Sequence, residues 1–371
     1  MDRVSLYKKA IDLKALTLEE GLFLYENSPL SELTFVANEI RKKYRNDNKV
    51  TWIIDRNVNI TNVCISDCSF CNFHRKLKDE DTFTTTLDEY IEKIEAMLKK
   101  GGNQLLLQGG MHPKYGIEFY EELFSTLKSR YPEVKLHSLG PPEIHHISKK
   151  SKLSYRETLV RLQAAGLDSL PGAGAEILSD RVRKTLSPGK ATTEQWLEVM
   201  REAHRLNMVT SATMMFGHIE TTSERVEHLL KLRDVQEQRP VGSNGFTAFI
   251  PWTVYTEGTK LAETYDCKPV TPSSYVRLIA MSRILLNNVP NIQASWLTVG
   301  KATAQACLYA GANDMGSIMI EENVVSSAGA NYQMDAESIQ KAIIEAGFIP
   351  QLRNQAYEYQ DMPEGVPVLK K

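Results

Sequence analysis

The sequence predicts an α/β fold, a (β/α)8 barrel of the TIM type with an N-terminal helical extension. From residue 51 onward, eight strand-like segments are each followed by a helical segment, which is the alternation of such a barrel. No GxGxxG fingerprint follows a strand to favour the alternative, an open doubly wound sheet, and no low-complexity linker divides the region. We expect a helical extension over residues 1–48, the barrel over 49–350, and a tail over 351–371 that packs on the barrel.

Residues 1–48 are expected to form helices. Thr17 and Glu20 have the spacing of a capping box, and Pro29 follows Ser28 at a second helix start. Apolar residues then recur at Leu30, Leu33, Phe35, Val36 and Ile40. A single apolar face of this kind predicts packing on the body of the protein.

The strand-like segments are short and rich in apolar and β-branched residues, as buried parallel strands are. They lie at 51–60, 104–108, 134–139, 167–170, 209–215, 245–250, 292–296 and 312–315. The helical segments lie at 87–100, 116–131, 154–165, 192–206, 223–238, 273–287, 301–310 and 335–346. Functional residues are expected just after each strand, because the active site of such a barrel lies at the C-terminal ends of its strands.

The loop after the first strand holds three of the chain's five cysteines, Cys64, Cys68 and Cys71, with the spacing CxxxCxxC. Three thiolates on one short loop predict a soft metal centre whose fourth ligand comes from elsewhere. A zinc site would take that ligand from His74, Cys267 or Cys307. Zinc is disfavoured because no second CxxC is present, and disulfides because the number of cysteines is odd. A 4Fe-4S cluster with one open iron is the favoured interpretation.

With Phe70 directly before its last cysteine, this motif resembles the signature of the radical S-adenosylmethionine (SAM) enzymes. The resemblance implies that Cys64, Cys68 and Cys71 bind a 4Fe-4S cluster whose open iron chelates SAM, which is cleaved to methionine and a 5′-deoxyadenosyl radical. Phe70 and Phe73 would lie beside these cofactors. The resemblance also implies a low-potential electron donor, such as flavodoxin or ferredoxin.

Four positions at strand ends are expected to bind SAM. Gly109 and Gly110 follow the second strand. Paired glycines allow close approach of a ligand or a tight turn, and the family has a Gly-Gly pair here that binds the amino group of SAM. Glu176, after the fourth strand, would hold the ribose hydroxyls of SAM, or else pair with Arg181 at helical spacing. Thr213 on the fifth strand completes the set.

Four blocks resemble, within this family, the menaquinone (futalosine pathway) and deazaflavin cofactor synthases, and most of all the enzymes that cyclise dehypoxanthine futalosine. The blocks are residues 170–178, 184–190, 213–218 and 322–326. This implies hydrogen removal from the ribose C4′ of dehypoxanthine futalosine, attack on its benzoate ring, and loss of one electron and one proton. Aminofutalosine synthase and a deazaflavin synthase subunit are alternatives, and a non-catalytic zinc-binding barrel is the alternative from another class.

The catalytic candidates are acceptors for that last proton, namely His218, His112 and Glu322 in this order. His218 follows a glycine at the end of the fifth strand, where an imidazole suits proton transfer. Capping of the next turn is the alternative for His112. Two loops are also expected at strand ends, a rigid polar loop at 139–146 and a basic loop at 183–190 whose lysines lie in solvent.

The bulk composition narrows the possible partners. The formal net charge is −2, which argues against nucleic-acid binding, because that needs a basic excess. No run of about eighteen apolar residues predicts a membrane span, and the polar start lacks the apolar core of a signal peptide. We therefore expect a cytoplasmic enzyme with a small-molecule substrate and with no nucleic-acid or membrane partner.

Overall fold

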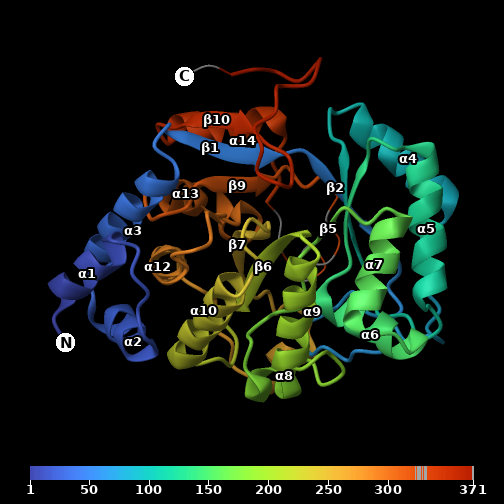
Figure 1. The fold of residues 1–371 in the computed structure, drawn as a ribbon, viewed down its shortest axis with the longest axis horizontal. Coiled ribbons are helices and arrows are strands. Elements are labelled where there is room, and N and C mark those ends of the chain that lie inside the picture. The colour runs from blue at the N-terminus through green and yellow to red at the C-terminus, as the bar shows by residue number, and fades with distance from the viewer. Residues whose placement is uncertain (322, 324–326, 328, 330–331, 370–371) are drawn as a thin grey trace.

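In the computed structural model, which describes residues 1–321, 323, 327, 329 and 332–369, parallel strands form a barrel surrounded by helices (Figure 1). The strands are β1 Lys49–Ile53, β2 Asp55–Asn59, β3 Gln104–Gln108, β4 Lys135–Ser138, β5 Ser169–Leu170, β6 Val209–Phe216, β7 Gly245–Thr253, β8 Asn291–Ile292, β9 Asp314–Ser317 and β10 Ile349–Leu352. One sheet has the order β2-β3-β4-β5-β6-β7-β8 and the other β10-β1-β9. These strands all pair in parallel.

Two connections close the ring of strands. β1 and β2 belong to one stretch that is interrupted at Ile54, and a parallel bridge from Gln293 to Asp314 joins the end of β8 to β9. β9 pairs in turn with β1, where Thr51 lies opposite Asp314. With β1 and β2 counted as one strand, eight strand positions surround the interior, and the predicted (β/α)8 barrel is confirmed.

The helices cover the outside of this ring (Figure 1). They are α1 Arg3–Ile11, α2 Leu18–Asn27, α3 Leu30–Tyr44, α4 Leu87–Leu98, α5 Ile117–Arg130, α6 Pro141–Ser151, α7 Tyr155–Ala165, α8 Asp180–Leu186, α9 Thr193–Arg205, α10 Thr222–Glu237, α11 Lys260–Thr264, α12 Pro272–Leu285, α13 Trp296–Leu308 and α14 Ala336–Glu345. Capping boxes start α4, α7, α9 and α10. All eight helices predicted between residues 87 and 346 are present.

Three predicted segments at strand ends were wrong. Residues 139–146 are mostly helix α6 rather than loop, because Pro141 lies in its first turn, where proline is tolerated, and Glu143 closes a capping box. Residues 183–186 form the last turn of α8 and not a basic loop. Trp296, expected to end a strand, begins α13.

The N-terminal helices pack on the outside of the barrel, α3 against α12 and α2 against α10. Leu33, Val36 and Ile40 are buried, but Phe35, expected on the same face, is 65% exposed because it lies off this helical stripe. At the other end, β10 extends the sheet beyond β1 and crosses the predicted boundary between the barrel, which was expected to end at residue 350, and the tail, which was expected to start at residue 351.

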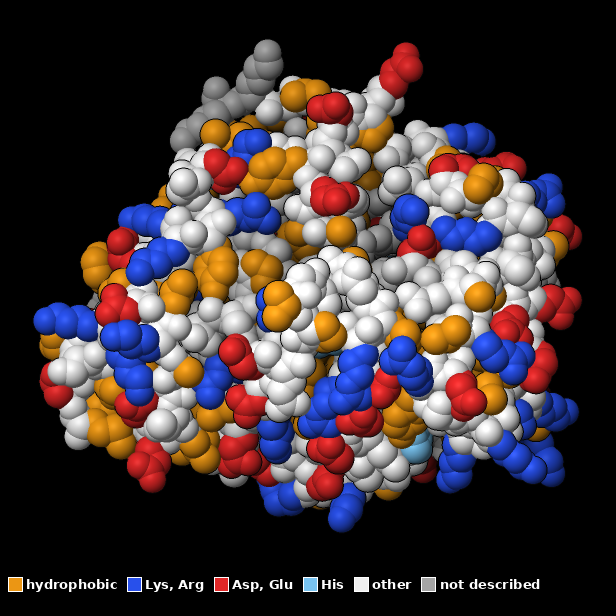
Figure 2. Space-filling view, in the orientation of Figure 1, with side chains coloured by type: hydrophobic (Ala, Val, Ile, Leu, Met, Phe, Trp, Pro, Cys, Tyr) orange, Lys and Arg blue, Asp and Glu red, His pale blue; other side chains and the backbone are white. Residues whose placement is uncertain are grey.

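The outer surface carries charged side chains of both signs, interspersed over the face shown in Figure 2. Apolar side chains such as Trp52, Trp196 and Phe246 lie in the core instead. Within the described ranges, no helix has both the length and the apolar character that crossing a membrane would take.

Candidate active site

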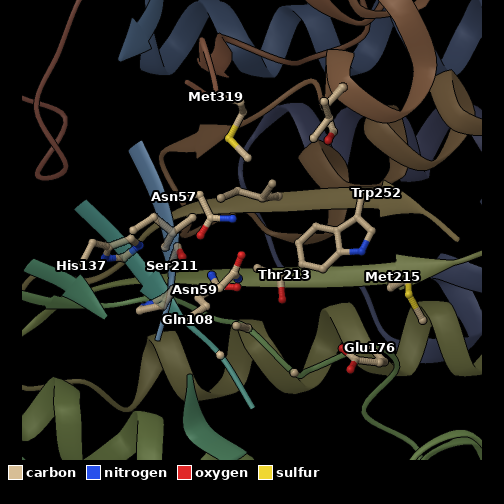
Figure 3. A pocket seen from close by; sticks show the side chains of 18 of the residues that line it. Asn57, Asn59, Gln108, His137, Glu176, Ser211, Thr213, Met215, Trp252 and Met319 are labelled. Atoms are coloured by element: carbon tan, nitrogen blue, oxygen red, sulfur yellow. The ribbon is translucent and has the colours of Figure 1, made fainter. Parts of the chain in front are cut away.

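The barrel encloses a cavity of about 390 Å³ that extends from the cysteine loop to the segment after β10. This volume lies in the range of small-molecule sites. Figure 3 shows part of its wall, in which inward-facing residues of several strands converge. The metal and cofactor candidates Cys64, Cys68, Cys71, Phe70, Phe73, Gly109, Gly110, Glu176 and Thr213 all line it. The end of the cavity at the cysteine loop is called the mouth below.

The cysteine loop is tied to other parts of the chain by backbone hydrogen bonds. The N–H of Ile65 donates to Met111 O at 3.0 Å, which fixes the loop to the segment after β3. The N–H of Ser69 donates to Leu186 O at 2.8 Å, which fixes it to the end of α8. The positions of the three thiols are therefore set by the barrel and not by the loop alone.

Hydrogen-bond donors point at the sulfur atoms of the loop. The N–H groups of Ser66 and Met111 lie 3.4 and 3.3 Å from Cys64 Sγ, and the Ser66 hydroxyl lies 3.1 Å from Cys68 Sγ. Burial raises the pKa of both thiols, so thiolates here need a positive partner such as a metal. Donors to sulfur are also a feature of iron–sulfur sites. The surroundings of the sulfurs fit a metal–thiolate centre.

The three possible zinc ligands are engaged or distant. His74 Nδ1 lies 2.8 Å from Cys71 O and its Nε2 lies 3.2 Å from Asp67. Cys267 is not part of the cavity wall, and Cys307 is buried on α13. Among the described residues, no group of three or more His, Cys, Asp or Glu side chains is arranged to hold a single ion. A four-iron cluster is larger than one ion and needs only the three thiols, so these residues fit the cluster.

Gly109 and Gly110 are required by the packing of the chain itself. A Cβ on Gly110 would lie 2.2 Å from Val63 O, and a Cβ on Gly109 would lie 3.0 Å from Thr61 N. The N–H of Gly110 donates to Thr61 O at 2.7 Å. The glycine pair therefore brings the end of β3 against the cysteine loop, and its contact with SAM stays a prediction.

Glu176 forms a buried ion pair with Lys190 in the cavity wall. The carboxylate and the Lys190 ammonium are 2.5 Å apart, and the Glu176 side chain is 5% exposed. Arg181, its alternative partner, pairs with Glu224 instead. The expectation that Lys190 lies in solvent was wrong, because its side chain is only 16% exposed. Besides the contact with Glu176, its ammonium lies 5.2 Å from the centre of the Phe70 ring. Glu176 has a φ of +42°, a strained conformation of the kind found at functional sites.

The two charges of this pair hold each other ionised. Burial alone would raise the pKa of Glu176, but the Lys190 ammonium outweighs burial and lowers it. Burial alone would lower the pKa of Lys190, but Cys68 and Glu176 raise it. The mouth therefore carries a fixed carboxylate and a fixed ammonium beside the cysteine loop.

Thr213 and the two phenylalanines complete the predicted cofactor set. The Thr213 hydroxyl donates to Gly172 O at 2.5 Å, which joins β6 to the segment after β5. Phe73 packs edge-on against Phe83 with ring centres 6.0 Å apart. These contacts fix the side chains in the cavity wall, and their contacts with cofactors stay predictions.

Glu143 is a buried carboxyl in the cavity wall that the sequence analysis missed. It accepts hydrogen bonds from the N–H of Gly140, at 2.7 Å, and of Gly109. Burial raises its pKa to about 7 in spite of these donors. Glu143 therefore links the start of α6 to the glycine pair.

Glu143→Gln is expected to remove a pH dependence of stability between the ordinary carboxyl pKa of 4.5 and about 7. In this window the unfolded chain has lost the proton that the folded chain retains, so stability falls as pH rises. The total loss of folding stability across this window is roughly 3 kcal/mol. Anaerobic urea unfolding of the holoenzyme on both sides of the window measures it, and equal pH slopes in parent and variant would contradict the assignment.

His218, the first candidate for the proton acceptor, lies outside the cavity. Its Nδ1 is 2.8 Å from the Glu220 carboxylate and its Nε2 is 3.0 Å from Met215 O. Both side chains are fully buried, and Arg225 pairs with Glu220 at 2.6 Å. His218 therefore supports the end of β6 from behind the cavity wall.

His112 also lies outside the cavity wall. It stacks on Tyr115 with ring centres 3.7 Å apart, and its Nδ1 accepts from the N–H of Lys114 at 3.1 Å. This geometry matches the alternative of a turn cap. Glu322, the third candidate, lies outside the described residues.

The polar inner face of β2 was not predicted from the sequence. Asp55, Asn57 and Asn59 line the cavity, and Figure 3 labels the two asparagines. Alternate residues of a strand face the same side, so polar residues at every second position of Asp-Arg-Asn-Val-Asn were an available signal.

The segment after β10 lines the end of the cavity opposite the mouth, here called the floor. Arg353 and Gln355 line it, and Gln355 Nε2 is 3.2 Å from His137 Nε2. Arg353 Nε is 2.6 Å from the Asp314 carboxylate. No local sequence pattern indicates this role, because the contact from Gln355 to His137 spans 218 positions.

Known proteins resemble nearly the whole chain. The family model "Radical SAM superfamily" matches residues 58–232, and "CofH/MqnC C-terminal region" matches residues 243–366. A cyclic dehypoxanthine futalosine synthase of Streptomyces coelicolor is 43% identical over 95% of this chain and 88% of its own length. One of Halalkalibacterium halodurans is 38% identical over 95% and 93%. A 5-amino-6-(D-ribitylamino)uracil–L-tyrosine 4-hydroxyphenyl transferase of Methanosarcina barkeri is 37% identical over 92% and 90%.

Solved structures share the fold at low sequence identity. Methylornithine synthase (PylB) matches with a TM-score of 0.71 and 19% identity, over 95% of this chain and 98% of its own. HydG, a maturase of the [FeFe]-hydrogenase, matches with a TM-score of 0.72 and 14% identity, over 94% and 75%. At these identities the likeness concerns the barrel architecture.

Proposed function

Because the chain belongs to the radical SAM superfamily, we propose that it is a cyclase that converts dehypoxanthine futalosine to cyclic dehypoxanthine futalosine in menaquinone biosynthesis. The observation that carries the proposal is the identity of 43% and 38% with two synthases of this product over 95% of the chain. The family implies a 4Fe-4S cluster and SAM as cofactors, and the cysteine loop fits that cluster.

The proposed reaction forms one carbon–carbon bond within the substrate. When bound, the cluster and SAM would supply a 5′-deoxyadenosyl radical that takes the hydrogen from the ribose C4′. The substrate carbon radical attacks the attached benzoate ring, and loss of one proton and one electron restores aromaticity. That electron would pass to the oxidised cluster when the cluster is bound. The product is therefore two hydrogens lighter than the substrate.

The chain's own part is to hold the reactants and to exclude water. Cys64, Cys68 and Cys71 would hold the cluster at the mouth, and Glu176 would hold the ribose hydroxyls of SAM beside it. The surrounding barrel keeps other hydrogen donors from the substrate radical. The acceptor of the last proton has to reach the cavity, so His218 and His112 are no longer proposed for this role.

A second candidate is supported by the transferase relatives, which are 37% identical to this chain. The activity that their name gives, transfer of a 4-hydroxyphenyl group from L-tyrosine to 5-amino-6-(D-ribitylamino)uracil, is the deazaflavin-type alternative. The higher identity with the futalosine synthases favours the first candidate. The non-catalytic zinc-binding barrel is wrong, because the chain belongs to a family of enzymes.

Anaerobic, reconstituted protein given SAM, dithionite and dehypoxanthine futalosine is expected to form 5′-deoxyadenosine and a product two hydrogens lighter than the substrate. Liquid chromatography with mass spectrometry detects both. A parallel reaction contains L-tyrosine and 5-amino-6-(D-ribitylamino)uracil instead, and should give no coupled product. Coupling in that reaction, with no lighter product in the first, would favour the second candidate.

A further inference from the structure

The inner face of β2 forms a continuous polar strip along the cavity. Asp55, Asn57 and Asn59 line the cavity, whereas Arg56 points outward and pairs with Glu321 at 2.9 Å. Successive inward residues of a strand are separated by roughly 6.6 Å along its axis. The three side chains therefore present polar groups at regular intervals from the floor toward the mouth.

Two atoms of this strip are buried without a hydrogen-bond partner among the described residues. They are Asn57 Oδ1 and Asn59 Nδ2, on side chains of residues that are 4% and 3% exposed. Asn59 Oδ1 already accepts from Asn323 Nδ2 at 3.1 Å, which fixes the orientation of its amide. A buried polar atom costs free energy until it is paired. The open acceptor and the open donor call for a ligand that both donates and accepts, as hydroxyl groups do.

The charges around the strip favour hydroxyls over a carboxylate. Asp55 accepts from the Ser317 hydroxyl and from Gln104 Nε2 at 3.3 Å, and no ammonium or guanidinium bonds to it in the described structure. Arg353, the guanidinium that lines the floor, is bound by Asp314 at 2.6 and 3.0 Å. A ligand carboxylate at the strip would meet the Asp55 carboxyl, and Arg353, the guanidinium that acts on Asp55, is already neutralised by Asp314.

The wall formed by β7 has the opposite character. Its inward residues are Ala248, Ile250 and Trp252, and Met319 joins them in the cavity wall. In Figure 3 the Trp252 ring lies across the cavity from Asn57. An aromatic side chain of this kind packs well against a planar ring. The cavity therefore separates a hydrogen-bonding side from an aromatic side.

We propose that Asn57 and Asn59 bind the ring hydroxyls of the substrate's sugar, while its aryl group packs against Trp252 and Ile250. This inference rests on the proposed function, because it assumes a substrate that joins a ribose to a benzoate ring. The two asparagines are substrate-binding residues that hold the ribose, and with it C4′, toward the mouth.

The test is the Kd of dehypoxanthine futalosine for holoenzyme with SAM and without reductant, so that binding is measured in the absence of turnover. Asn57→Leu keeps the branched shape of the side chain and removes its hydrogen-bonding atoms, and is expected to weaken binding about tenfold. Substrate analogues that each lack one ring hydroxyl are measured on the parent enzyme, and at least one should bind about tenfold more weakly. That analogue and the substrate should bind Asn57→Leu alike.

Asn103→Leu is the matched control, because it makes the same substitution at an exposed asparagine outside the cavity. It should leave the Kd of the substrate unchanged. Equal binding of the substrate and of every deoxy analogue to the parent enzyme would overturn the proposal without any variant. Absence of substrate binding to the parent enzyme would instead refute the proposed function.

Discussion

Replacing Cys64 with alanine is expected to abolish both the visible iron–sulfur absorption of the reconstituted protein and the formation of 5′-deoxyadenosine. Cys64 Sγ lies in the cavity wall within reach of two N–H donors, and neither Cys267 nor Cys307 lines the cavity to replace it. A cluster that loses one of three protein ligands is no longer held with an open iron. Cys68→Ala and Cys71→Ala should have the same effect as Cys64→Ala.

Iron and sulfide content, the absorption spectrum and 5′-deoxyadenosine released with SAM and dithionite measure this effect. Cys267→Ser is the matched control, since this thiol is half-buried and lies outside the cavity. It should keep the parent's iron content and rate. Formation of 5′-deoxyadenosine at that rate in any of the three alanine variants would contradict the cluster assignment.

The barrel was predictable because its signals are local. Apolar runs, helical periodicity and capping boxes such as that at Thr86 each depend on a few neighbouring residues. Helix α6 was not predicted, because adjacent prolines such as Pro141 and Pro142 are typical of loops, although proline is also tolerated in a first helical turn. Strand β10 was not predicted, because it forms only by pairing with β1, some 300 positions earlier in the chain.

The cavity was predictable at the mouth and not at the floor. The cysteine spacing and the glycine pair are short motifs, and both line the cavity. The burial of Lys190 depends on Glu176, whose backbone has an unusual positive φ. The part played by Gln355 depends on how the chain returns beneath the barrel. Such long-range placements follow from the closed ring of strands and have no local signal.

Lys190→Met is expected to cost about 3–5 kcal/mol of folding stability, because it leaves the Glu176 carboxylate buried without its cation. Without Lys190, burial would raise the pKa of Glu176 above its ordinary value. The folded variant would then hold a proton that the unfolded chain releases. Its stability should therefore fall as pH rises from the ordinary carboxyl pKa of 4.5 to the raised pKa of Glu176. Anaerobic urea unfolding of the holoenzyme at several pH values measures the change.

The double variant Glu176→Gln/Lys190→Met separates folding from cofactor binding. A neutral amide and a thioether need no counter-charge, so stability should return to within about 1 kcal/mol of the parent. Affinity for SAM, measured by equilibrium dialysis, should be lower than in the parent if the Glu176 carboxylate accepts from the ribose hydroxyls, because an amide oxygen is the weaker acceptor. A double variant with the parent's SAM affinity and the parent's stability would show that the pair is structural. If Lys190→Met were as stable as the parent, the Glu176 charge would not be buried, which would contradict the 5% exposure of its side chain.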